Sequence, residues 1–163
     1  MKAKHIITAF LFVLSSISFA QQPKLTWYTS VFEASDAAIK ANKPVFAFFT
    51  GSDWCGWCIK LQNNVFSKTD FIVWAQKNVI LLELDFPRHK QLSPELTKQN
   101  NDLQQTFQVQ GFPTVWLFKP GKDAKTNQLQ ISPIGSLGYP PGTEPGKESV
   151  KFLETANSIL GVK

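Results

Sequence analysis

The sequence contains few of the residues that bind metal ions or build a disulfide framework. Among its 163 residues are two cysteines, two histidines and one methionine. Structural zinc and iron–sulfur sites use four ligands, and stapled mini-proteins use more than two cysteines, so both classes are excluded. A cysteine–histidine catalytic pair would depend on His89, because His5 lies in the leader described below. Since His89 sits in the polar stretch Pro87-Arg88-His89-Lys90, we expect a solvated loop residue there.

Charged residues are also sparse, and they do not cluster. They make up 18% of the chain, and the lysines are scattered without a run of four. This pattern argues against a nucleic-acid partner. Apolar residues make up 43%, and they include five tryptophans and fourteen phenylalanines. Such a composition predicts one packed domain that is neither disordered nor embedded in a membrane.

The first twenty residues have the pattern of an export signal. Lys2 and Lys4 give a positive start, residues 6–17 are mostly apolar, and Ser18 and Ala20 place small residues at a cleavage site. We therefore expect 1–20 to be a signal peptide and 21–163 to be a domain that is exported, either periplasmic or secreted. A retained anchor is the alternative, but the apolar stretch is shorter than the roughly 20 residues that span a bilayer. No stable membrane insertion is expected after cleavage.

Hydrophobic periodicity and turn residues predict alternating strands and helices in the rest of the chain. The run 45–49 is continuously apolar, which indicates a strand buried on both faces. Residues 119–122 are predicted to be a turn, and the glycine- and proline-rich segment 135–146 a loop. The order predicts an α/β fold, a single domain with a central mixed sheet flanked by helices. The expected strands are 25–28, 45–49, 79–86, 115–118 and 129–134, and the expected helices are 31–41, 55–65, 68–75, 94–107 and 147–160.

The two cysteines, Cys55 and Cys58, stand where a buried strand has ended and a helix begins. At a spacing of three residues their side chains share one face of a helix, close enough for a disulfide. A structural staple is one interpretation, although a four-residue ring contributes only about 1.9 kcal/mol of loop entropy. A copper(I) site made of two thiolates is another. The third, a dithiol–disulfide couple that exchanges with other proteins in an oxidising compartment, suits the position best.

The position also predicts different roles for the two sulfurs. Unpaired amides and the positive end of the helix favour the Cys55 thiolate, so Cys55 is expected to attack. Cys58, one turn further in, is expected to resolve the mixed disulfide. Trp54 and Trp57 flank the nucleophile, and Trp57 is expected to be an exposed apolar platform for a protein substrate. The amide of Trp57 is expected to point at the Cys55 sulfur as an additional donor.

Two segments carry a resemblance to the thioredoxin superfamily. The first is Trp54-Cys55-Gly56-Trp57-Cys58 after the strand 45–49, and the second is Val109-Gln110-Gly111-Phe112-Pro113-Thr114 before the strand 115–118. The wording from Lys43 to Cys58 is similar to that of exported bacterial thioredoxin-like proteins. The resemblance implies a thioredoxin fold, a cis Phe112–Pro113 bond packed against the cysteines, and a Phe112 backbone that pairs with an extended substrate. The expected substrate-binding surface is formed by Trp54, Gly56, Trp57, Phe112 and Pro113.

The sequence departs from thioredoxin in three places. Trp57 stands where thioredoxin has proline, and the strand 45–49 has no acidic residue where thioredoxin has a buried aspartate. Glu83 on the adjacent predicted strand is the nearest candidate acid or base, although an outward-facing strand glutamate would explain it equally well. The segment 87–106 is longer than in a minimal thioredoxin and forms either a partner surface or an extended helix.

Together these features predict an exported thiol–disulfide oxidoreductase that acts without cofactor or metal on protein disulfides or dithiols. The branch resemblance favours a reductase over an oxidase or isomerase. An exported reductase needs electrons, so a membrane electron donor is an expected partner. The alternative is a binding module of thioredoxin fold whose aromatic surface holds a partner and whose redox chemistry is incidental.

Overall fold

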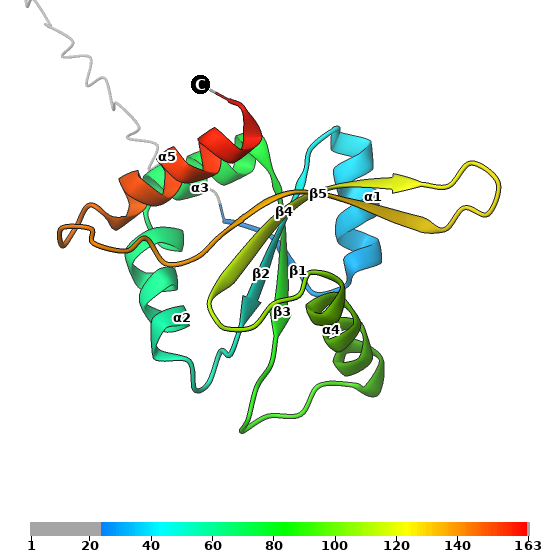
Figure 1. The fold of residues 1–163 in the computed structure, drawn as a ribbon, viewed down its shortest axis with the longest axis horizontal. Helices are drawn as coiled ribbons and strands as arrows, with labels where there is room; N and C mark the ends of the chain where they lie inside the picture. Colours follow the sequence, from blue (N-terminus) through cyan, green and yellow to red (C-terminus); the bar gives the residue numbers. More distant parts are fainter. Residues whose placement is uncertain (1–23, 163) are drawn as a thin grey trace, which may run out of the picture.

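The structure, a computed structural model, describes residues 24–162, so the expected signal peptide 1–20 lies outside the described residues. Figure 1 shows a central sheet with helices on both sides. Among residues 24–162, none of the helices could span a lipid bilayer. The elements in chain order are β1 (Trp27–Tyr28), α1 (Val31–Ala41), β2 (Val45–Thr50), α2 (Gly56–Leu61), the π-helical turn η1 (Gln62–Phe66), α3 (Thr69–Asn78), β3 (Ile80–Asp85), α4 (Pro94–Thr106), β4 (Thr114–Lys122), β5 (Leu129–Leu137) and α5 (Glu148–Leu160).

The sheet has five strands in the order β1-β3-β2-β4-β5. β1 and β2 run parallel to β3, whereas β4 runs antiparallel to both β2 and β5. All six residues of β2 are buried, which confirms the prediction that this apolar run is covered on both faces. The mixed α/β sheet and the thioredoxin-like fold are therefore as predicted.

Alternate side chains of β2 divide the core into two halves. Phe46 and Phe48 face a cluster that includes both cysteines and is covered by α2, α3 and α5. Val45, Ala47 and Phe49 face the other cluster, under α1 and α4. The period of two along a strand produces this division, and it places the cysteines on the Phe48 face.

Local signals set the helix ends. The Ser30 hydroxyl accepts a hydrogen bond from the Glu33 amide, and Ser93 caps α4 in the same way ahead of Pro94. Asn42 ends α1 in the left-handed region at φ 52°. The helix predicted over 55–65 is divided, because η1 replaces its second half with a wider π-helical turn.

The prediction of a turn at 119–122 is wrong. These residues continue β4 and pair with β5, from Lys119↔Ser132 to Lys122↔Leu129. Pro120 is tolerated because the pairing with β2 ends at Phe118, so its missing N–H falls beyond the partner strand. The turn itself lies further on, where the Asp123 carboxylate accepts bonds from the amides of Lys125 and Thr126.

The predicted loop 135–146 is also partly wrong, because β5 extends to Leu137. Gly135 pairs with Leu117 inside the sheet. A Cβ at Gly135 would lie 2.8 Å from Cγ2 of Ile159. The glycine therefore marks a close approach of α5 to the strand rather than the start of a loop.

Candidate functional site

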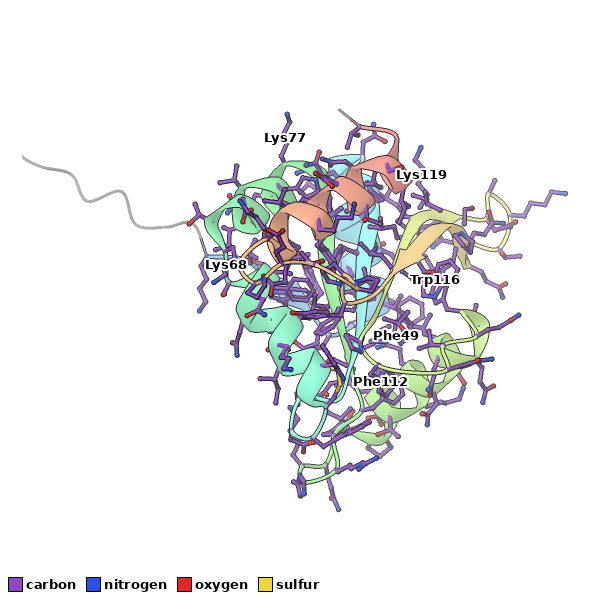
Figure 2. The ribbon with its side chains drawn as sticks, turned by 60° about the vertical axis from the view of Figure 1, so that its left-hand side comes forward. Phe49, Lys68, Lys77, Phe112, Trp116 and Lys119 are labelled. Carbon is purple, nitrogen blue, oxygen red and sulfur yellow. A yellow bond between two sulfur atoms is a disulfide. The ribbon has the colours of Figure 1, made fainter. Side chains whose placement is uncertain are left out.

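Cys55 and Cys58 form a disulfide at the beginning of α2, with their Cα atoms 5.2 Å apart. Cys55 is the N-cap residue of this helix, and Cys58 lies within it. Cys55 is 5% exposed and Cys58 is fully buried, so the first sulfur is the more accessible one. In Figure 2 the yellow sulfur–sulfur bond lies beside Phe112, which packs against the cluster that contains both cysteines.

The amide that reaches the Cys55 sulfur is that of Cys58, with the nitrogen 3.2 Å from Sγ. The prediction that the Trp57 amide makes this contact is therefore corrected. An N-cap side chain bonds to the amide two or three positions into the helix, and here the sulfur takes the third. This N–H favours the Cys55 thiolate once the disulfide is reduced.

Three consecutive residues tie the loop before Cys55 to the end of β3. The backbone amide and hydroxyl of Ser52 donate to the Asp85 carboxylate at 2.8 and 2.7 Å. The Asp53 carboxylate accepts from the Arg88 amide at 3.0 Å and the His89 amide at 2.7 Å. The indole nitrogen of Trp54 donates to the Phe86 carbonyl at 2.7 Å. The segment that presents the nucleophile is thus fixed by hydrogen bonds to a distant part of the chain, each of which involves at least one side chain.

The pKa of Asp53 lies below its ordinary value. The hydrogen bond from the Arg88 amide is the main cause, desolvation opposes it, and the His89 amide and the nearby His89 ring add to the lowering. His89 itself is a surface residue whose Nδ1 lies 3.6 Å from Asp53, in agreement with the prediction of a solvated loop residue. Lys90 forms an ion pair of 2.8 Å with Asp85.

An aromatic wall lies on one side of the disulfide. Trp54 meets Phe112 edge to face, and Phe86 stacks on Phe112 with ring centroids 5.0 Å apart. The Phe112–Pro113 peptide bond is cis in the structure. A Cβ on Gly51 would lie 2.4 Å from the Trp54 ring, so only glycine allows the indole to lie there.

The other side is formed by Trp57, which is 56% exposed. Its ring meets Tyr139 edge to face at 5.1 Å, and the Tyr139 hydroxyl accepts a bond from the Asn64 amide group. Gly56 is exposed, and a Cβ there would meet nothing within 4 Å. Of the expected substrate-binding residues, Trp54 and Phe112 therefore pack against the cluster that contains both cysteines, whereas Gly56 and Trp57 are exposed to solvent.

Glu83 lies on β3 opposite Phe48, so it shares the sheet face that carries the cysteines. It is half-buried, and burial raises its pKa above the ordinary value. The nearby Asp85 charge raises the pKa further, and Lys90 opposes both. Its place in the fold is compatible with an acid or base role, which stays a prediction.

Sequence reasoning missed Ser52, Asp53, Asp85 and Arg88 as parts of the site. Nothing in the sequence pairs Asp85 with Ser52, which lies 33 residues earlier, or Arg88 with Asp53, which lies 35 residues earlier. Within residues 24–162, no three histidine, cysteine or acidic side chains come together where they could hold a metal ion.

Comparisons with known proteins agree with this geometry. The family model of the thioredoxin-like domain matches residues 31–128. The disulfide bond reductase DsbH of Chlamydia pneumoniae is 34% identical over 115 residues, 71% of this chain and 68% of the relative. The thioredoxin-related protein DsbJ of the same organism is 26% identical over 83% of this chain, but only 37% of DsbJ is covered.

Solved structures give the same result for the fold. A structure titled DsbH oxidoreductase superimposes with a TM-score of 0.70 and 28% identity, covering 88% of this chain and 94% of the other. A thioredoxin from Thermus thermophilus gives a TM-score of 0.57 at 17% identity, over 83% of this chain and 87% of that one. The second likeness concerns the fold alone.

Proposed function

Because this chain belongs to the thioredoxin-like domain family, we propose that it is an exported reductase of protein disulfides that uses Cys55 and Cys58 without a cofactor. One observation carries the proposal. Cys55 and Cys58 form a disulfide at the start of α2, and the backbone amide of Cys58 donates a hydrogen bond to the sulfur of Cys55. Thiol–disulfide oxidoreductase chemistry follows from the family and the cysteine pair. The direction and the compartment are the parts that we propose.

The reaction needs only the two thiols and the substrate disulfide. The Cys55 thiolate attacks one substrate sulfur, a mixed disulfide forms, and the other substrate sulfur leaves as a thiolate that takes up a proton. Cys58 then loses its proton and attacks the Cys55 sulfur, which releases the second substrate thiolate and closes the Cys55–Cys58 disulfide. Two electrons pass from protein to substrate. An external dithiol must then reduce the Cys55–Cys58 disulfide for the next cycle, and a membrane electron donor is the expected partner.

The surface around Cys55 supports protein substrates. Trp57 offers an exposed apolar face, and the wall of Trp54 and Phe112 borders the other side. The backbone at Phe112 and Pro113 is the expected edge for pairing with an extended substrate segment, as the family resemblance implies. Glu83 is the expected proton acceptor near this chemistry.

The reductase direction is favoured by the sequence relationship. The relative that shares 34% identity carries the name disulfide bond reductase. The leader 1–20 supports export to the periplasm or secretion. The protein would then act in an oxidising compartment.

Equilibration of the pure protein with glutathione buffers tests the proposal. A reductase is expected to have a potential close to about −270 mV, the value of thioredoxin, whereas an oxidase would lie near about −120 mV. The same protein is expected to reduce insulin with a dithiol donor. A Cys55 pKa near about 8.5 together with no insulin reduction would instead favour the binding module.

A further inference from the structure

We propose that the substrates of this site carry acidic residues beside the cysteine that they present, and that Arg88 and Lys60 select them. The inference rests on the proposed function and adds a substrate class to it. Two cations placed on the two tryptophans that flank Cys55 are the observation behind it.

Arg88 lies on the Trp54 side of the nucleophile. Its guanidinium carbon is 3.8 Å from the centroid of the Trp54 ring, and the residue is exposed. Its backbone amide donates to Asp53, which holds the main chain of Arg88 beside the motif. A guanidinium stacked on an indole keeps its edge donors free for a carboxylate.

Lys60 provides a second cation, placed on Trp57. Its Nζ lies 4.4 Å from the centroid of the Trp57 ring, one helical turn further along α2. Lys60 and Trp57 are both exposed. A peptide that binds at Cys55 and contacts both tryptophans would therefore meet two positive charges.

The acidic side chains that contact these loops are directed at partners within the protein. Asp53 directs its carboxylate to the amides of Arg88 and His89, and 22% of its side chain is exposed. Asp85 is 8% exposed and is bound by Ser52 and Lys90. Both negative charges are thus held by partners within the protein, whereas Arg88 and Lys60 remain available to solvent.

Such an arrangement acts on the encounter with the substrate. Surface charges of one sign raise association rates of oppositely charged partners by about 10–1,000-fold at low ionic strength, and salt removes the effect. The thiol chemistry itself is the same for every substrate. The charge pattern therefore predicts a difference between substrates in the rate of mixed-disulfide formation.

The test compares two disulfide peptides that differ only in the flanking residues, glutamate in one and lysine in the other. The reduced full chain is mixed with each peptide, and the loss of peptide disulfide is followed at low salt. We expect the acidic peptide to react about tenfold faster or more, and the ratio to approach one at about 1 M salt. Because both peptides meet the same thiol, the ratio cancels any change in thiol reactivity.

Variants locate the effect. Arg88→Gln combined with Lys60→Gln is expected to bring the ratio close to one, and each single change to give an intermediate value. Lys77→Gln removes the same charge from the last turn of α3, at the opposite end of the molecule from Phe112 in Figure 2, and is expected to keep the wild-type ratio.

The neutral reagent hydroxyethyl disulfide distinguishes a failure of the proposed reductase function from a failure of the acidic-substrate inference. If the reduced protein does not react with it or with either peptide, the proposed function fails, and this inference with it. If it reacts but the two peptides react equally fast, or the basic one faster, only the acidic-substrate inference is overturned. A high ratio that survives in the double variant would overturn the assignment to Arg88 and Lys60.

Discussion

Asp85, the last residue of β3, accepts two hydrogen bonds from Ser52 in the loop that leads to Cys55. One comes from the backbone amide and one from the hydroxyl, so the carboxylate fixes both the main chain and the side chain of Ser52. The ends of β2 and β3 are neighbours in a parallel pair, with Thr50 opposite Asp85, and this brings the two residues together. The position of the redox motif thus depends on a residue that lies after it in the chain.

This contact predicts a coupled loss of stability. Ser52→Ala removes one hydrogen bond and is expected to lower the free energy of unfolding by about 0.5–1.5 kcal/mol, whereas Asp85→Asn is expected to cost about 1–3 kcal/mol. Because the residues share the interaction, the double variant should cost less than the sum. Urea denaturation of all four proteins measures this coupling, and strictly additive losses would contradict it.

The two glycines of the motif region are expected to respond in opposite ways to alanine. Gly51→Ala forces the Trp54 ring away from the position 2.4 Å from the new Cβ, and should destabilise the protein by about 1–3 kcal/mol. Gly56→Ala places a methyl group in open space on α2, and should stabilise it by about 0.4–1 kcal/mol. Thermal unfolding of both variants tests the pair, and a stable Gly51→Ala protein would show that the indole can move freely.

The cysteines are expected to fail at different steps. Cys55→Ser should form no mixed disulfide with a protein substrate, because the attacking sulfur is gone. Cys58→Ser should form the mixed disulfide and retain it, because no thiol remains to release it. Non-reducing electrophoresis and mass spectrometry distinguish the two. Normal turnover by Cys58→Ser would contradict the assignment of roles.

Glu83 is expected to make stability depend on pH. Burial raises its folded pKa above the ordinary value of 4.5, so the folded state binds the proton more tightly than the unfolded state. Stability is therefore lost as pH rises from about that value through the folded pKa. Glu83→Gln removes this loss, and its advantage over the wild type in urea denaturation should be larger at pH 7 than at pH 4.

Glu95 provides the matched control with the opposite sign. Its own backbone amide and the Ser93 side chain lower its pKa, so its charged form favours the folded state. Glu95→Gln should therefore lose stability relative to wild type as pH rises from the lowered folded pKa to about 4.5, a window that lies below that of Glu83. The same direction for both variants would show that the pKa of Glu83 is not raised by burial.

The exchange reaction tests Glu83 as an acid or base. An unchanged rate of mixed-disulfide resolution in Glu83→Gln would contradict that role.

The corrected hydrogen bond changes what is expected of Trp57. Because the Cys58 amide serves the Cys55 sulfur, Trp57→Pro should have the same reduction potential as Trp57→Ala. Both variants lose the indole, and only the proline variant loses the Trp57 amide. Equilibration with glutathione compares them, and a more reducing potential in the proline variant alone would restore a role for that amide.

The sequence alone determined the fold class, the disulfide and most element positions. Local causes explain this success: Ser30 and Ser93 cap helices through bonds to nearby amides, and the apolar run of β2 can only be buried on both faces. The Cys55–Cys58 pair is equally local, since three residues of helix bring the sulfurs together. Each of these predictions needs only a few neighbouring residues.

Tertiary structure decided the features that depend on residues far apart in the sequence. Pro120 and Gly135 suggested a turn and a loop, but strand pairing and the packing of Ile159 place both in the sheet. Nothing local to Ser52 or Asp85 indicates that they meet, or that Arg88 lies on Trp54. The sequence thus identifies the sulfurs that react, whereas the register of β2 against β3 determines which side chains surround them.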